Sequence, residues 1–258
     1  MRASLFLLVT AALLTVLAAS CGGGESRATR ETGATESQAS STLPRGSEPV
    51  ELDPSDFTTT IDNPYWPMKP GSRWVYRETD GKGGKARVEV TVTSRVKTVA
   101  AGVEAVVVHD VVSEEGEVVE DTFDWYAQDA QGNVWYLGEN TKEFENGKLK
   151  STEGSWEAGV DGAQAGIILP ANPKPGLTYR QEYYEGEAED AAEIVAVDET
   201  ARVPFGSFEH VLTTRDFTPL EPKLVEHKFY ARGVGPVLAV TVSGGSDREV
   251  LVSFEPAS

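Results

Sequence analysis

Few residues in this sequence could act in catalysis. There are three histidines, His109, His210 and His227, and one cysteine, Cys21. A histidine-activated nucleophile needs a serine or cysteine in a strained turn, and the sequence has no Gly-x-Ser-x-Gly pattern. The histidines are too widely spaced to indicate a metal centre, and a single cysteine cannot supply a zinc site that needs two thiolates. We therefore predict no catalytic residue, no metal site and no cofactor, and we expect a protein that is not an enzyme.

Carboxylate pairs offer a different chemistry, because glycoside hydrolases act through two carboxyl groups that face each other across a cleft. Acidic residues gather at Glu120, Asp121 and Asp124, and again between Glu185 and Asp190. The chain has 41 acidic residues, so such pairs also arise without catalytic meaning. We expect most of them on solvated strand faces and in turns. A hydrolase of cell-wall glycans stays as an alternative.

Aromatic side chains are more suggestive of ligand binding. Tryptophan and tyrosine combine an apolar body with a polar tip, which suits the lining of a pocket. Neighbouring aromatics on a strand point to opposite faces, so only one of Trp125 and Tyr126 can face a given cavity, and the other must be packed or covered. Core packing is the alternative for each candidate. The residues that we expect to contact an apolar or amphipathic ligand are Trp66, Trp125, Trp135, Trp156, Ile168 and Tyr183.

The segment before the cysteine has the features of a secretory signal. Residues 1–20 begin with one basic residue, Arg2, and continue as an apolar run without an acid. The segment ends in a sequence that resembles the lipobox of bacterial lipoproteins, Leu17-Ala18-Ala19-Ser20-Cys21. In that pattern the cysteine is lipidated and becomes the new N-terminus. We predict a signal peptide over 1–20 and acylation of Cys21, as with palmitate, which anchors the protein to the extracytoplasmic side of a bacterial membrane in the cell envelope. An ordinary secretory signal is the alternative.

The charge and composition limit the partners. The formal net charge of -18 excludes nucleic acid as a default partner, because duplexes attract basic surfaces. Anionic headgroups repel an acidic protein as well, so we expect the lipid alone to hold it to the membrane. Residues 21–50 contain no aromatic residue and are rich in Gly, Ser, Thr and Glu, which predicts a disordered tether. Flexible-chain scaling gives that tether an end-to-end distance on the order of 30 Å.

The rest of the chain, 51–258, has the pattern of β-strands. Val88, Val90 and Val92 alternate with polar residues, and no period near 3.6 residues is sustained beyond Trp74. Dipeptides that hairpin turns prefer separate the apolar segments; they are Asp80-Gly81, Glu115-Gly116, Gln131-Gly132, Asn146-Gly147 and Gly244-Gly245. We predict an all-β fold made of an antiparallel meander.

The meander is expected to be duplicated. Lys69-Pro70-Gly71 recurs as Lys174-Pro175-Gly176, and Trp125-Tyr126-Ala127 matches Phe229-Tyr230-Ala231 at nearly the same shift. One copy alone would expose too much apolar surface, so we expect both to share one core as a curved sheet, a sandwich or a barrel. The expected bounds are about 64–140 for copy one and about 174–246 for copy two.

A glycine-rich insertion, 151–173, separates the two copies and carries Trp156 and Ile168. Large apolar groups in a glycine-rich segment are typical of a lid or a binding loop. The alternative is a connector that fills one end of the sheet with its own side chains.

Two motifs resemble those of a group of uncharacterised bacterial envelope lipoproteins. The first is the opening Asn63-Pro64-Tyr65-Trp66-Pro67-Met68-Lys69-Pro70-Gly71, and the second is the hairpin Tyr230-Ala231-Arg232-Gly233-Val234-Gly235. The resemblance covers about 55–245. It implies a secreted or lipid-anchored β-domain and brings no established activity or site residues with it.

These observations favour a non-enzymatic, membrane-tethered β-protein that binds an apolar or amphipathic ligand, or a partner protein, outside the cytoplasm. An acidic structural or inhibitory envelope protein that engages a cationic partner is the alternative. The glycan hydrolase is a second alternative.

Overall fold

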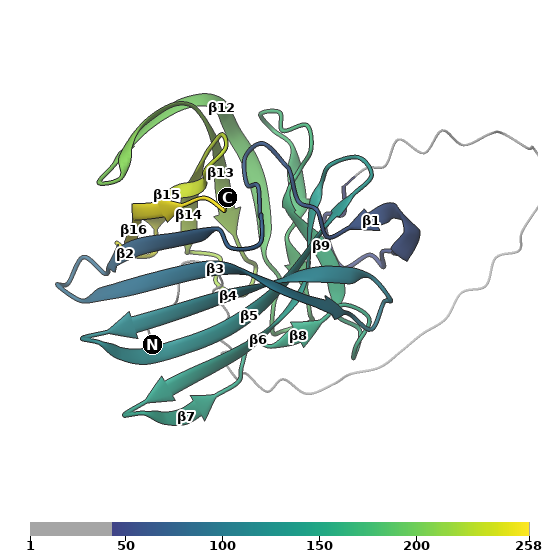
Figure 1. Ribbon diagram of the computed structural model, residues 1–258, viewed down its shortest axis with the longest axis horizontal. Coiled ribbons are helices and arrows are strands. Elements are labelled where there is room, and N and C mark those ends of the chain that lie inside the picture. Colours follow the sequence, from purple (N-terminus) through teal and green to yellow (C-terminus); the bar gives the residue numbers. More distant parts are fainter. Residues whose placement is uncertain (1–42, 258) are drawn as a thin grey trace, which may run out of the picture. The chain divides into compact units, whose positions relative to one another are not determined.

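The computed structural model describes residues 43–257, in which the chain is built almost entirely of β-strands (Figure 1). The predictions for the signal peptide and for Cys21 therefore lie outside the described residues. The elements are a 3-10 helix η1 (Pro54–Asp56) and the strands β1 (Phe57–Thr58), β2 (Arg73–Thr79), β3 (Lys85–Thr98), β4 (Glu104–Glu114), β5 (Glu117–Asp129), β6 (Val134–Glu145), β7 (Lys148–Ser151), β8 (Trp156–Glu157), β9 (Gln164–Leu169), β10 (Thr178–Arg180), β11 (Glu182–Tyr183), β12 (Ala191–Val203), β13 (Gly206–Phe217), β14 (Val225–Ala231), β15 (Gly235–Ser243) and β16 (Arg248–Glu255).

The strands form one antiparallel sheet that curves almost into a closed barrel. The sheet order is β10-β12-β13-β14-β15-β16-β2-β3-β4-β5-β6-β9-β11. The first and last strands of this order, β10 and β11, are separated in the chain by Gln181 alone. Residues 178–183, here called the closing segment, therefore pair with β12 through β10 and with β9 through β11. Of the three expected architectures, the structure forms the nearly closed barrel, and the predicted all-β antiparallel fold is confirmed.

Alternation and turn chemistry explain the long strands. Val88, Val90 and Val92 of β3 are buried, whereas the polar residues between them are partly exposed. The β4–β5 turn has positive φ angles of 52° at Glu115 and 92° at Gly116. Two consecutive positive φ angles are the geometry of the tight hairpin turns that match strand twist. The hairpins thus form where the dipeptides predicted them.

The two Lys-Pro-Gly segments make the same backbone hydrogen bonds. The N–H of Gly71 donates to the carbonyl of Val92 at 2.8 Å, and the N–H of Gly176 donates to that of Ile194 at 2.9 Å. Both glycines have positive φ angles, 96° and 84°. Each turn therefore attaches its strand to the following long strand in the same way.

The closing segment passes very close to β9. A methyl group placed on Gly166 of β9 would lie 2.3 Å from the backbone C and O atoms of Gln181.

The glycine-rich insertion contributes β8 and β9 to the wall of the sheet, and its Trp156 and Ile168 are 4% and 7% exposed. Among residues 43–257, no helix has the length and apolar composition needed to cross a membrane.

Candidate ligand-binding site

Carboxyl groups line the inner side of the curved sheet. Cross-strand neighbours share a face of a sheet. Ala239 of β15 is the cross-strand neighbour of both Lys228 of β14 and Glu249 of β16. Glu249 is in turn the cross-strand neighbour of Glu78 of β2. Trp74, on the same face of β2 as Glu78, is fully buried, so this face is the interior. We use the name acid cluster for the acidic residues gathered there: Glu78, Asp110, Glu120, Asp124, Glu139, Glu182, Asp190, Asp216, Glu226 and Glu249.

Burial raises the pKa of most of these groups, and the negative charges of their neighbours raise it further. The pKa of Glu78, Glu120, Asp124, Asp190 and Glu226 rises to about 7. Removing a carboxylate from water is costly, so the protonated form is favoured. For Asp124, a hydrogen bond of 2.8 Å donated by the hydroxyl of Tyr136 opposes the shift without cancelling it. Much of the cluster is therefore protonated at neutral pH.

Lys228 supplies positive charge within the cluster. Its Nζ lies 3.0 Å from Oδ2 of Asp216, and both side chains are largely buried. Burial alone would lower the pKa of Lys228, but the carboxylate of Asp216, with Tyr230 and Glu226, raises it above its usual value. Lys228 is thus held as a cation by Asp216.

Arg180 attaches the beginning of the described chain to the closing segment. Its guanidinium donates to the carbonyl oxygens of Gly46, of Glu48 at 2.9 Å, and of Ala165 in β9 at 2.8 Å. Its backbone N–H donates to the carbonyl of Pro44 at 2.6 Å. Residues 44–48, which lie within the segment expected to be a tether, are thus hydrogen-bonded to the side chain and backbone of Arg180.

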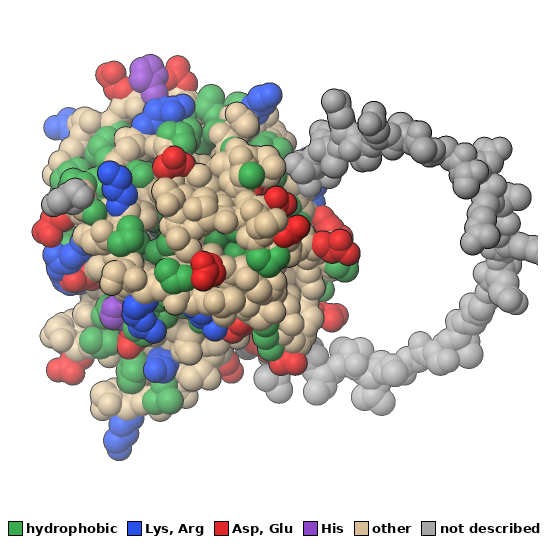
Figure 2. All heavy atoms as spheres, turned by 45° about the vertical axis from the view of Figure 1, so that its right-hand side comes forward, with side chains coloured by type: hydrophobic (Ala, Val, Ile, Leu, Met, Phe, Trp, Pro, Cys, Tyr) green, Lys and Arg blue, Asp and Glu red, His purple; other side chains and the backbone are tan. Residues whose placement is uncertain are grey.

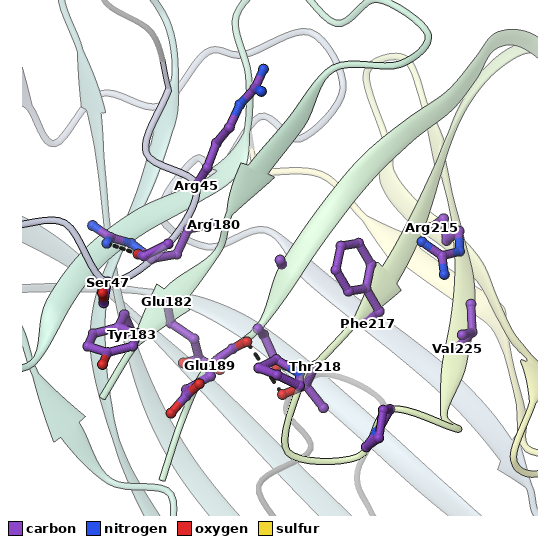
Figure 3. A pocket seen from close by; sticks show the side chains of 15 residues that line it. Arg45, Ser47, Arg180, Glu182, Tyr183, Glu189, Arg215, Phe217, Thr218 and Val225 are labelled. Atoms are coloured by element: carbon purple, nitrogen blue, oxygen red, sulfur yellow. Dashed lines mark hydrogen bonds between the residues drawn. The ribbon is translucent and has the colours of Figure 1, made fainter. Parts of the chain in front are cut away.

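A cavity of about 510 Å³ lies beside this attachment, between the beginning of the described chain, the closing segment and the β13–β14 connection (Figure 3). Its lining residues are Arg45, Gly46, Ser47, Arg180, Glu182, Tyr183, Glu189, Asp190, Ala191, Arg215, Phe217, Thr218, Pro219, Pro222 and Val225. One part of this lining is apolar and another is formed by carboxyl groups. This combination suits a ligand with an apolar body and a polar end.

Glu182, Glu189 and Asp190 form the acidic part of the lining, which also contains Arg45, Arg180 and Arg215. Glu182 is 1% exposed, and no described residue donates a hydrogen bond to either of its carboxylate oxygens. Burial raises the pKa of Glu182 well above its usual value, and Asp190 raises it further, while the indole of Trp156 opposes the shift. The backbone N–H groups of Gln181 and Glu182 both donate to the carbonyl of Asp190, at 2.7 and 3.3 Å. These bonds hold Glu182 and Asp190 next to each other.

Of the six residues expected to contact a ligand, Tyr183 lines this cavity. Trp66 is buried between Tyr126 and Tyr230, with ring centroids 5.7 and 6.2 Å away. Trp156 is buried near Glu182 and packs edge-on against a tyrosine of β6, and Ile168 lies in the core. These three side chains therefore occupy core positions.

The two remaining tryptophans are covered on the outer side of the sheet. The ammonium of Lys97 lies 4.4 Å from the ring centroid of Trp125. The ring of Phe57, from β1, packs edge-on against Trp135 at 5.8 Å. Each therefore has a structural partner, as expected for the aromatic that points away from the interior.

The histidines do not come together. His109 stacks on Phe123 and interacts with Asp121 at 2.7 Å, and His210 interacts with Asp198 on the β12–β13 hairpin. Within residues 43–257 no group of three or more histidine, cysteine or acidic side chains is arranged to hold a metal ion.

Among its described residues, one face of the molecule carries no large patch of a single kind of side chain (Figure 2). On the face shown in Figure 2, charged side chains of both signs are dispersed, and hydrophobic side chains form small separate groups.

The expectation that the acidic residues lie on solvated faces is wrong for Asp124, which is 7% exposed. The sequence did contain a signal for the burial of Asp110, because this residue lies in alternation with Val106, Val108 and Val112 and so shares their face of β4. Nothing in the local sequence distinguishes Glu182.

No protein-family model matches the chain, and no curated protein matches its sequence. A crystal structure of a candidate lipoprotein from Parabacteroides distasonis aligns with 74% of this chain and 98% of that chain, at 15% sequence identity and a TM-score of 0.41. At these values the likeness assigns neither a family nor a ligand to this chain.

Proposed function

We propose that this protein is a non-enzymatic binding protein, tethered to the outer side of a bacterial membrane, that takes an amphipathic ligand into the cavity beside the closing segment. The observation that carries the proposal is the cavity itself, which joins an apolar wall to buried carboxyl groups. Its volume of about 510 Å³ is in the range of small-molecule sites.

The apolar wall comes from the ends of two strands and their connection. Phe217 ends β13, Val225 begins β14, and Pro219 and Pro222 lie between them. Prolines reduce the conformational freedom of this connection, so a ligand that packs on it costs little ordering entropy. An alkyl or ring system is the kind of group that this wall would cover.

The position of the cavity in the chain also supports the proposal. Arg45 and Ser47 line it, and the predicted lipidation site, Cys21, precedes Arg45 by 24 residues. A flexible chain of this length spans on the order of 30 Å. A lipidated protein would therefore keep the cavity close to the membrane that contains amphipathic molecules.

The test uses the apolar fluorescent probe N-phenyl-1-naphthylamine and the mature chain with Cys21→Ser. We expect the probe to bind with increased fluorescence, and Val225→Asp to weaken its binding at least tenfold. Val242→Asp is the matched control, because Val242 is 51% exposed on β15 and does not line the cavity. Circular dichroism verifies that both variants keep their strand content. Equal binding by the Val225→Asp variant, or no binding by the parent, would overturn the proposal.

A further inference from the structure

We propose that the cavity binds the ammonium group of a cationic amphiphile, which Glu182 and Asp190 receive while the apolar wall covers the rest of the molecule. This inference rests on the proposed function and specifies the ligand class. The buried, unsatisfied acceptors at the cavity are the observation that leads to it.

Among the residues that the structure describes, Glu182 lacks a hydrogen bond of normal geometry, although the indole of Trp156, which also has no hydrogen-bond partner there, lies close enough to lower its pKa. Its side chain is 99% buried, it lines the cavity, and neither of its oxygens accepts a hydrogen bond from the described residues. Oδ1 of Asp190, which also lines the cavity, is buried and has no hydrogen-bond partner among residues 43–257. A buried polar group without a partner is costly, and a donor that arrives with a ligand removes this cost. An ammonium group brings three donors and a positive charge.

The arginines around the cavity do not supply that donor. The two terminal nitrogens of Arg180 donate to the backbone carbonyls of Gly46, Glu48 and Ala165, and its buried Nε has no hydrogen-bond partner among the described residues. Arg215 lies over the ring of Phe217, at 4.8 Å from its centroid. In Figure 3 the side chain of Arg45 extends away from Glu182. An anionic headgroup beside Glu182 and Asp190 would thus meet carboxyl groups, whereas a cation would find acceptors there.

The surroundings of the two acidic residues are also predominantly acidic. Lys228 lowers the pKa of both Glu182 and Asp190, but its ammonium is already 3.0 Å from Asp216. Asp124 of β5 raises the pKa of Glu182, and Asp216 of β13 and Glu226 of β14 raise that of Asp190. Glu182 in turn raises the pKa of Tyr136 and Glu139 of β6. The described part of the interior therefore carries more acidic than basic groups, and an additional cation would be stabilised.

Binding of a cation would be linked to proton release. Burial and neighbouring charges raise the pKa of Asp190 to about 7 and raise that of Glu182 well above its usual value. At neutral pH Asp190 is therefore protonated in part of the molecules and Glu182 in most of them, and an ammonium ion displaces these protons by stabilising the carboxylates. An alkylamine, with a pKa of about 10 like that of lysine, stays charged throughout. Its affinity should rise with pH between 6 and 8.

The experiment compares three probes with the same alkyl chain: decylammonium, decanol and decanoate. Isothermal titration calorimetry on the mature Cys21→Ser chain gives the dissociation constants at pH 6, 7 and 8. Titration in two buffers of different ionisation enthalpy gives the number of protons released. Glu182→Gln and Asp190→Asn are the test variants, and Glu185→Gln, at an exposed position outside the lining, is the control.

We expect decylammonium to bind at least tenfold more tightly than decanol at pH 7.5, with proton release, and decanoate to bind most weakly. Glu182→Gln should remove the preference for decylammonium and reduce the proton release, and Glu185→Gln should change neither. If all three probes bind equally, or if decylammonium binds without proton release, the inference is overturned and the proposed function stands. If none of the probes binds, both are overturned.

Discussion

Glu249 on β16 and Glu78 on β2 are direct cross-strand neighbours inside the barrel, and their side chains are 3% and 9% exposed. Two carboxylates at such positions repel each other. Burial, and then the neighbouring charge of Glu78, raise the pKa of Glu249 well above its usual value. The pair is therefore compatible with the fold because at least one member holds a proton.

Replacing one member of this pair should stabilise the protein at alkaline pH. Glu78→Gln removes a buried carboxylate that its neighbours oppose, and we expect the free energy of unfolding at pH 8 to rise by about 1 kcal/mol. At pH 5, where both carboxyl groups are already protonated, the change should be small. Urea unfolding at the two pH values measures this, with the exposed Glu117→Gln as the control. A loss of stability at pH 8 would contradict the proposed protonation.

The whole acid cluster should make the unliganded protein more stable in weak acid than in weak base. The pKa of Glu78, Glu120, Asp124, Asp190 and Glu226 is about 7 in the fold, above the unfolded values near 4 to 4.5. The folded state therefore binds more protons than the unfolded state. The stability that these groups contribute is fully present below pH 4 and is lost as the pH rises through about 7.

We therefore expect a higher Tm at pH 5 than at pH 8. The surface residue Glu89 acts in the opposite direction, because hydrogen bonds from Arg73 and Arg87 lower its pKa to about 2, but that contribution is lost only below about pH 4.5. Differential scanning calorimetry in 0.5 M salt separates buried groups from screened surface charges. A Tm that is equal or higher at pH 8 would show that the cluster is not protonated in the fold.

Replacing Lys228 should destabilise the protein, because the buried carboxylate of Asp216 would lose its cationic partner. Lys228→Met leaves Asp216 as a buried anion, and we expect a loss of about 3 kcal/mol at pH 7. The second substitution Asp216→Asn should recover much of this loss in the double variant, because it removes the uncompensated charge. Chemical denaturation of the single and double variants measures the coupling. Additive losses would indicate that the two residues act independently.

The barrel should be sensitive to a single methyl group where it closes. Gly166→Ala would place a Cβ 2.3 Å from the backbone of Gln181, so the closing segment would have to move away from β9. We expect a loss of about 3 kcal/mol and faster hydrogen exchange in β9 and β11. Gly206→Ala is the control, because its nearest new contact is an ordinary 3.7 Å to the ring of Phe208. Equal Tm values for both variants would contradict this account of closure.

Cys21 should determine where the protein resides. Cys21→Ser removes the thiol that the predicted acylation requires, so we expect the protein to leave the membrane fraction and to lack covalent acyl chains. Fractionation of cells labelled with an alkyne-tagged palmitate measures both properties. Retention of the variant in the membrane fraction would indicate a different anchor.

The sequence was sufficient to predict the strands and many of their turns. Alternation at Val88, Val90 and Val92 is a local property, and the Glu115-Gly116 turn depends only on residues that tolerate positive φ. Closure of the barrel could not be predicted, because it depends on contacts between distant segments. The approach of Gln181 to Gly166 is one such contact, and a glycine in an apolar segment is equally compatible with a bulge or a bend in the strand.

The candidate site was predicted less well than the fold. Tyr183, which was expected to contact a ligand, lines the cavity, but Glu182 was not among the predicted site residues. An acidic residue on a strand is usually solvated, and its burial here follows from the curvature of the sheet and from the pairing of β11 with β9. Such burial is a tertiary property, which the spacing of residues along the chain does not encode.

The pairing of β2 with β16 has a consequence for how the chain reaches its native state. β2 comes early in the order of the strands, and its partner β16, Arg248–Glu255, follows it in the chain after all the other strands of the sheet. Until β16 has been synthesised, one edge of β2 lacks this neighbour and offers unpaired N–H and C=O groups to other chains. A growing polypeptide of this kind benefits from chaperones that cover the edge, and a chain without β16 should aggregate more readily.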